Sequence, residues 1–327
     1  MGMAPNVRYF WDEPIDHELI RKSATAAFSF DDDKVKWDKL WDWRYVNNPL
    51  SDKVYAAYIM EDETVACFYA ISPIPILTKD NSVINAGLAV TGFTHPDFQG
   101  RGYYSELYNQ TQKVLADMGF ACLLAFDNHN SHYPEVKYLN WRDIGVLTNF
   151  SLNCDNIKPL TNRHTDIKIV KQELSDELLR ELSTFHTNSA QFSVQRSFKY
   201  LKWRLMENPI NKYQARVLYA GTDMLACAIY KMYGDTGCDI MEMFYRCNID
   251  TEIHEFAYLL MHDLAVRERK QINMWSQLQS AEHLFLEKIG FEERCFSTYF
   301  VCNTMQIGHE ILDIRNWHYR FMDSDVY

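Results

Sequence analysis

The sequence repeats itself once, and this repeat limits what the chain can fold into more than any other feature does. The segments WRYVNNPLSDKVYAAYIMEDETVACFYAI and WRLMENPINKYQARVLYAGTDMLACAIYKM begin at Trp43 and Trp203. Both contain Trp-Arg, then Asn-Pro, then two strand patterns joined by a polar turn, the second of which carries Ala-Cys. Because the copies lie about one domain length apart, the chain is predicted to be a duplication of one folding unit.

The repeat continues to the end of each half, where YLNWRDIGVLTNFSLNC is similar to EKIGFEERCFSTYFVCN. The polar segment CDNIKPLTNRHTD between the halves has the composition of a linker. We therefore predict an N-terminal domain over residues 1–157 and a C-terminal domain over residues 158–327. In each half a hairpin is followed by alternating strands and helices. This order predicts an α/β fold of two fused domains, each a mixed sheet with helices on both faces.

Composition excludes several classes of protein. The chain has 327 residues, of which 47% are hydrophobic, and a formal net charge of -11. A nucleic-acid partner is not expected, because phosphate contacts need clustered Lys and Arg. The eight cysteines form no C-x-x-C pair, so no metal is expected and a reducing cytoplasm is favoured. Neither a signal peptide nor a membrane-spanning stretch is indicated. The expected partners are small molecules, and the oligomeric state stays open.

A glycine-flanked arginine lies where a strand pattern changes to a helix pattern, in FTHPDFQGRGYYSEL. The strand is predicted from Ile84 and the helix from about Tyr103 to a stop at Gly119. Free N–H groups at a helix start stabilise a phosphate, and glycines let the backbone approach it. Arg101 would add a charge-assisted hydrogen bond. The alternative is a mobile surface turn.

This stretch resembles motif A of the GNAT superfamily of acyl-CoA-dependent N-acyltransferases. Gln99, Gly102 and Tyr104 fall on its marked positions, and Thr94-His95-Pro96 falls on its entry. Tyr104 stands where the family usually has a small residue. The resemblance implies that acyl-CoA is the co-substrate and that this loop holds its pyrophosphate. The expected cofactor-binding residues are Thr94, Gln99, Gly100, Arg101, Gly102, Tyr103, Tyr104, Asn130 and Ser131, of which the last two are alternatively an ordinary helix N-cap.

The resemblance also implies where the chemistry takes place. Backbone groups of Gly92, Phe93 and Thr94 would contact the thioester and the developing oxyanion. The family's usual thiolate donor is a tyrosine, but its position here falls on Val136 in the first half and on Leu286 in the second.

Other side chains near the same strands are candidates for proton transfer. Tyr138 is a candidate acid, with Tyr133 also close in the sequence. His95 and Asp127 are candidate bases, although the segment His-Pro-Asp also makes a good turn. We expect that no side chain acts as an obligatory base and that the amine attacks directly.

The second half lacks the loop. Its long helix, in IDTEIHEFAYLLMHDLAVRERK, has no glycine at its entrance. One cofactor per chain is therefore expected, with the second half serving a structural and acceptor-binding role.

Two fused halves of which only the first keeps the loop, Trp-Arg and Asn-Pro in both, and the C-terminal NWHYRFMDSDVY together resemble a narrower group. Over nearly the full chain the sequence is similar to bacterial nucleotide-sugar N-acyltransferases, which acylate dTDP-linked amino-dideoxy sugars for surface polysaccharides such as O-antigen, capsule or S-layer glycan. This resemblance implies an acetyl or short 3-hydroxyacyl donor, for example 3-hydroxybutanoyl-CoA.

The expected acceptor-binding residues are Arg44, Tyr45, Asn48, Arg204, Trp275, Gln277 and Gln279. The last two alternate along the predicted strand NMWSQLQS, so both would face one side of it. For the paired Trp-Arg elements, a purely structural role is the alternative. Two further functions stay open: acyl transfer to an aminoacyl or cysteinyl conjugate, and CoA binding without turnover.

Overall fold

The computed structural model describes residues 5–28, 33–158, 167–185, 190–235, 237–246, 250–268, 271–278 and 280–325. The chain forms two compact units. The first unit contains residues 1–76, 83–144 and 300–312, and the second contains residues 77–82, 145–299 and 313–327. No helix in the described part of the chain is both long and apolar enough to cross a membrane.

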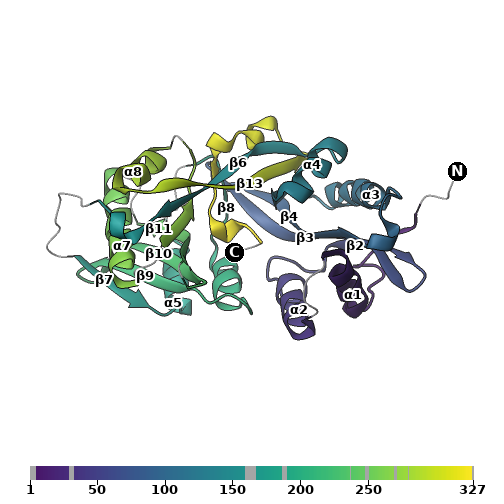
Figure 1. The fold of residues 1–327 in the computed structure, drawn as a ribbon, viewed down its shortest axis with the longest axis horizontal. Helices are drawn as coiled ribbons and strands as arrows, with labels where there is room; N and C mark the ends of the chain where they lie inside the picture. Colours follow the sequence, from purple (N-terminus) through teal and green to yellow (C-terminus); the bar gives the residue numbers. More distant parts are fainter. Residues whose placement is uncertain are drawn as a thin grey trace. The chain divides into compact units, whose positions relative to one another are not determined.

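The first unit is a mixed sheet with helices on both faces, and its strand order is β1-β2-β3-β4-β5-β13. The pairs β1–β2 and β2–β3 are antiparallel, and the pair β4–β5 is parallel. Helices α1 and α2 lie on one face and α3 and α4 on the other (Figure 1). The elements are β1 (Val7–Tyr9), α1 (His17–Phe28), α2 (Lys34–Trp41), β2 (Ala56–Glu61), β3 (Thr64–Thr78), β4 (Val83–Thr94), α3 (Tyr103–Asp117), β5 (Cys122–Asp127) and α4 (His129–Tyr138).

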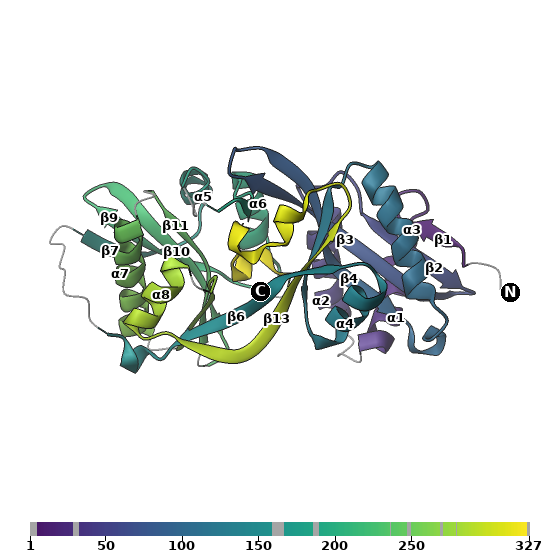
Figure 2. The same ribbon diagram turned by 90° about the horizontal axis from the view of Figure 1, so that it is seen from above.

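The second unit has a sheet with the strand order β6-β12-β11-β10-β9-β7, in which β11 and β12 are parallel. Helices α7 and α8 lie side by side and share one apolar core with the strands (Figure 2). The elements are β6 (Arg142–Leu152), β7 (Ile167–Gln172), α5 (Asp176–Leu182), β8 (Phe192–Val194), α6 (Phe198–Leu201), β9 (Gln214–Ala220), β10 (Asp223–Tyr233), β11 (Gly237–Tyr245), α7 (Asp250–Glu268), β12 (Gln271–Trp275), α8 (Ala281–Ile289), β13 (Glu292–Thr304) and β14 (Trp317–His318).

The structure shows the same local geometry in both copies of the repeat. In the first half α2 runs into a π-helical turn, η1 (Asp42–Val46), and in the second half α6 runs into η4 (Lys202–Met206). Each turn buries its tryptophan. Asn48 and Asn208 then accept hydrogen bonds of 2.9 Å from the backbone N–H groups two residues later. Together with the matching order of strands and helices, these shared turns agree with a duplicated fold.

The last strand of each half completes the sheet of the other unit. Residues 149–152 of β6 pair with β12 in the second unit. The end of β13 lies next to β5 in the first unit, and the N–H groups of Met305 and Gln306 donate to the Ala121 carbonyl. The compact units therefore do not divide at residue 157, where the sequence repeat divides, and that boundary stays a prediction about the repeat alone.

A network of buried charges holds the end of the chain in the second unit. Arg196 donates to Glu242 at 2.6 Å and to Asp323 at 2.6 Å, and all three side chains are almost fully buried. His318 lies 3.2 Å from the same Glu242 carboxylate. Although burial by itself raises the pKa of Glu242, the charges of Arg196 and His318 lower it below its usual range. These buried charges stabilise the fold only while Arg196 and its two carboxylates, Glu242 and Asp323, are all present.

We expect Arg196→Ala to lower the free energy of unfolding by about 3–5 kcal/mol, because Glu242 and Asp323 would stay buried without their cation. Urea denaturation measures this change. Arg315→Ala is the matched control, since Arg315 pairs with Asp313 at the surface, and it should leave the urea midpoint nearly unchanged. Equal effects of the two substitutions would contradict the structural role of the buried network.

Candidate active site

The parallel pairing of β4 and β5 stops before either strand ends. Their register runs from Ala86–Cys122 to Leu88–Leu124, whereas β4 continues to Thr94 and β5 to Asp127. The last residues of β4 therefore have backbone groups on the β5 side that this ladder does not use. Such groups can hydrogen-bond an extended ligand that runs along the strand.

The loop after β4 is shaped by two glycines with left-handed backbone conformations. Gly100 has φ of +74° and Gly102 has φ of +78°, which other residues adopt only with strain. No heavy atom lies within 4 Å of where a Cβ at either position would be. Gly102 is the N-cap of α3 and provides no side-chain hydrogen bond to the first turn. The first-turn N–H groups of a 15-residue helix therefore point toward open space, which is suitable for an anion.

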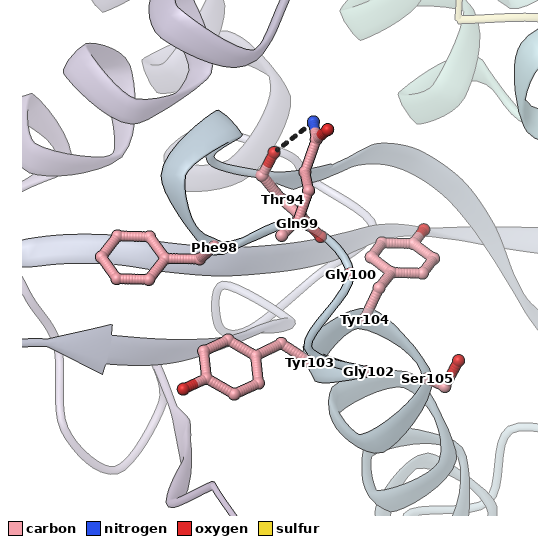
Figure 3. Close-up of a pocket in the computed structure, with 8 residues that line it drawn as sticks. All are labelled: Thr94, Phe98, Gln99, Gly100, Gly102, Tyr103, Tyr104 and Ser105. Atoms are coloured by element: carbon pink, nitrogen blue, oxygen red, sulfur yellow. Dashed lines mark hydrogen bonds between the residues drawn. The ribbon is translucent and has the colours of Figure 1, made fainter.

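A cavity of about 210 Å³ lies at this loop (Figure 3). Its lining residues come from the end of β4, the loop and the start of α3: Thr94, Phe98, Gln99, Gly100, Gly102, Tyr103, Tyr104 and Ser105. The structure thus brings together most of the residues predicted to bind the cofactor. Arg101 does not line the cavity.

The side chains of Arg101 and Gln99 each hydrogen-bond to a backbone carbonyl of the loop segment 94–97 and so hold its conformation. The Arg101 guanidinium donates to the Asp97 carbonyl at 3.2 Å and lies over the Phe98 ring. Gln99 Nε2 donates to the Thr94 carbonyl at 3.4 Å, as the dashed line in Figure 3 shows. Because Arg101 is exposed, its guanidinium can still contact a ligand bound at the loop.

No protein-family model matches the sequence, and no curated protein matches it. Solved structures do. The chain is similar to a probable N-acyltransferase from Enterococcus faecalis V583, with a TM-score of 0.69, 11% identity, and 93% of this chain and 73% of that chain covered. It is also similar to a GCN5-related N-acetyltransferase from Anabaena variabilis, with a TM-score of 0.67 and 11% identity. That match covers 91% of this chain and 73% of the other. A tandem GNAT protein from the clavulanic acid biosynthesis pathway matches with a TM-score of 0.58 and 11% identity, and 91% of this chain and 98% of that chain are covered.

The fold is that of the GCN5-related N-acetyltransferases. The α/β prediction of two fused GNAT-like units is therefore confirmed. In this GNAT fold the glycine loop, β4 and α3 of the first unit occupy the places that the resemblance to motif A predicted.

Tyr103 and Tyr104 leave the start of α3 in different directions (Figure 3). The Tyr103 hydroxyl donates to Glu61 on β2. The Tyr104 ring packs edge-on against Tyr69 at 6.3 Å, and its hydroxyl lies against Gly92 on β4. The unusual tyrosine of this motif therefore enters the space beside the strand that was predicted to contact the thioester.

The side chains of Phe93 and Thr94, at the end of β4, have structural partners. The Phe93 side chain is buried and stacks on Phe68. Thr94 Oγ1 lies 3.5 Å from the Cys67 sulfur. Burial raises the pKa of Cys67 to about 11, so this thiol is not a reactive nucleophile.

His95 performs the structural role that was considered as the alternative to a base. Its Nδ1 accepts a hydrogen bond of 3.3 Å from the Asp97 N–H, which caps the short 3₁₀ turn Pro96–Phe98. Its backbone N–H donates to the Ala66 carbonyl at 2.9 Å. A catalytic role for His95 stays a prediction.

Asp127 lies at the end of β5 as one member of a buried pair of carboxyl groups. Its Oδ1 accepts a hydrogen bond of 3.0 Å from the Ser131 hydroxyl. Glu135, on the buried face of α4, is the other member. Burial, repulsion by Asp127 and a hydrogen bond with Asp127 all raise the pKa of Glu135 well above its usual range. The physical cause is that a second negative charge so close to Asp127, and away from water, is unfavourable.

Glu135 was not predicted from the sequence. The available signal was helical spacing: Glu135 lies one turn after Ser131 and one turn before the buried Leu139, so the three residues share one face of the helix.

The tyrosines of α4 lie at the surface. The Tyr138 and Tyr133 side chains are 59% and 58% exposed and pack against each other and against Lys137. The N-cap of this helix is Asn128, which accepts from the N–H groups of Asn130 and Ser131. The segment does contain the helix N-cap that was the alternative to cofactor binding, but the capping residue is Asn128 rather than Asn130 or Ser131. Contacts of Asn130 and Ser131 with a cofactor stay a prediction.

The acceptor residues predicted in the first unit lie on η1 and just after it. The Tyr45 hydroxyl donates to Thr91 Oγ1 on β4 at 2.7 Å. Asn48 is buried and donates to Ser72 at 2.8 Å while it caps its own turn. Arg44 is half-buried. The Tyr45 bond thus joins η1 to β4.

In the second unit, two predicted acceptor residues have structural partners. The Arg204 guanidinium is buried and donates to the carbonyls of Met322 and Ser324 at 3.0 and 2.6 Å. Trp275 is buried against Phe321, and its carbonyl accepts from Arg320.

The predicted alternation of Gln277 and Gln279 along a strand is wrong for Gln277, because β12 ends at Trp275. Gln277 lies in the turn that leads to α8, and its carbonyl accepts from Ser280 at 2.7 Å. Gln279 lies outside the described residues. Among the described side chains, no group of three or more His, Cys, Asp or Glu is arranged to hold a metal ion.

We expect Gly92→Ala to destabilise the fold by about 1–3 kcal/mol, because the new methyl group would collide with the Tyr104 hydroxyl. In the Tyr104→Phe background the penalty should be smaller, since the colliding oxygen is gone. Urea denaturation of the two single variants and the double variant gives the coupling free energy. Strict additivity would show that the two positions are not in contact.

Proposed function

We propose that the protein is an N-acyltransferase that moves an acyl group from acyl-CoA to an amine. The observation that carries this proposal is the loop of the first unit, where two left-handed glycines leave the uncapped start of α3 facing a cavity. A diphosphate bound there would be stabilised by backbone N–H groups and the helix dipole, with Arg101 adding charge at the rim. The GNAT fold of the neighbours supports the same assignment.

The reaction needs little covalent help from the protein. The acyl chain and pantetheine arm would lie along β4, where the β5 ladder has ended and backbone groups remain available. A neutral amine within about 3–3.5 Å of the carbonyl attacks, and a backbone N–H of the segment 92–94 stabilises the oxyanion. We propose direct attack without an obligatory side-chain base. The hydrogen-bonding of His95 within its own turn supports this view.

For the acceptor we propose a dTDP-linked amino-dideoxy sugar, with an acetyl or short 3-hydroxyacyl donor, in cytoplasmic synthesis of a surface polysaccharide. The support is the resemblance of the whole sequence to nucleotide-sugar N-acyltransferases. A structural neighbour from a small-molecule biosynthetic pathway agrees with a small acceptor. Arg204 and Trp275 bind other parts of the second unit. Arg44 and Tyr45 are the acceptor-binding residues that we propose in the first unit, where the Tyr45 hydroxyl lies at β4.

Acceptor identity is tested by CoA release, detected with a thiol reagent. Acetyl-CoA and 3-hydroxybutanoyl-CoA are each incubated with a panel of dTDP- and UDP-amino sugars and with aminoacyl and cysteinyl conjugates. Release that depends on a dTDP-amino sugar supports the proposal. Release with another amine replaces the acceptor, and binding of acyl-CoA without release by any amine would make the chain a binding module.

The loop is tested by calorimetry with CoA. Gly102→Val should raise the dissociation constant at least about tenfold, because the side chain requires an unfavourable φ and fills the space before the first-turn N–H groups. Gly221→Val is the matched control: Gly221 also has positive φ and open space at its Cβ, but it lies between β9 and β10. The control should retain wild-type affinity. A stoichiometry of two CoA per chain would contradict the proposal that only the first unit binds it.

A further inference from the structure

The buried face of α4 carries no tyrosine for the leaving thiolate, and the Ser131 hydroxyl on this helix already donates to Asp127. Its two tyrosines are exposed, and the group that faces the interior is the Glu135 carboxyl. Val136, at the position of the usual donor, has an aliphatic side chain. If the first unit transfers an acyl group, a hydrogen-bond donor from another element is needed at the thioester sulfur.

Tyr104 places a hydroxyl group at the strand where the thioester is expected. Its side chain lines the cavity at the glycine loop, and its oxygen lies against Gly92, so close that any side chain at position 92 would collide with it. None of the described residues hydrogen-bonds with this hydroxyl. Its hydrogen is therefore available to a ligand.

Two features of the chain make room for this arrangement. Gly92 has no side chain, so the ring of Tyr104 can reach β4. The β4–β5 ladder ends at Leu88, four residues before Gly92, so β5 does not pair with the strand at this level. A tyrosine at the usually small position of the loop and a glycine opposite it thus form one complementary pair.

The surroundings keep the Tyr104 hydroxyl protonated. The side chain packs against Tyr69, whose own hydroxyl is buried and has no partner among the described residues. Burial first, and then the negative potential of Glu135, raise the pKa of Tyr104 well above its usual range. A phenol that stays neutral remains a hydrogen-bond donor throughout the range in which an amine is deprotonated.

We propose that Tyr104 donates a hydrogen bond to the sulfur of the acyl-CoA thioester, in place of a tyrosine on α4, and this inference rests on the proposed acyl transfer. As the C–N bond forms and the C–S bond breaks, the electron pair of the C–S bond moves to sulfur. The Tyr104 hydroxyl keeps its proton and stabilises the developing thiolate through this hydrogen bond. The proton that the amine loses passes through water to the thiolate, which gives the free thiol of CoA.

The principal test is Tyr104→Phe, which keeps the ring and removes only the oxygen. With the amine that releases CoA fastest in the panel described above, kcat should fall about a hundredfold while the KM for acyl-CoA changes less than about threefold. The matched control is Tyr108→Phe, one turn further along the same helix, where the lost hydroxyl is bonded to Gln112. Its kcat should stay within about twofold of wild type. Unchanged kcat in Tyr104→Phe, or equal losses in both variants, would overturn the inference.

A binding measurement separates this inference from the proposed function. Wild-type protein should bind CoA about two- to tenfold more tightly than desulfo-CoA, which lacks the sulfur, and Tyr104→Phe should bind both equally. Equal binding by the wild type would overturn the role of Tyr104 and leave acyl transfer standing. Failure of the wild type to bind either ligand would overturn the proposed function and, with it, the role of Tyr104.

Discussion

The candidate site depends on the left-handed backbone of two glycines. Gly100 and Gly102 turn the chain so that it leaves β4 and enters α3 without a side chain crossing the space between them. The peptide N–H groups of the first helical turn are then left for a ligand, because the N-cap has no side chain with which to satisfy them. Three neighbouring side chains take their positions from this turn: Arg101 lies over Phe98, Tyr103 bonds to Glu61, and Tyr104 reaches β4.

The backbone features of the site could be predicted from the sequence because they depend on local chemistry. Glycine spacing, a strand pattern and a helical period are properties of neighbouring residues, and they located β4, the loop and α3. The duplication was also visible, since Trp-Arg and Asn-Pro recur where η1 and η4 form the same turn. The CoA pyrophosphate site itself stays a prediction that this geometry supports.

Tertiary packing could not be predicted in the same way. Arg204 has the sequence context of Arg44, but the C-terminal segment supplies it with two carbonyl partners from more than a hundred residues away. Glu135 is one charged residue among several on α4, and only the helical phase relative to β5 brings it to Asp127. The strand predicted in NMWSQLQS was extended past Trp275, where β12 ends, because polar alternation does not show where a ladder ends.

The exchange of the last strands has a consequence for how the two halves can be separated. Each half contributes its final strand to the other unit, so a fragment cut at residue 157 would keep β6 without its partner β12 and would leave β5 without its neighbour β13. An apolar edge strand exposed in this way is a site of aggregation. The two halves are therefore interdependent: neither keeps all its strand neighbours when the chain is cut, so the fold of the first half needs the second half whatever the second half binds.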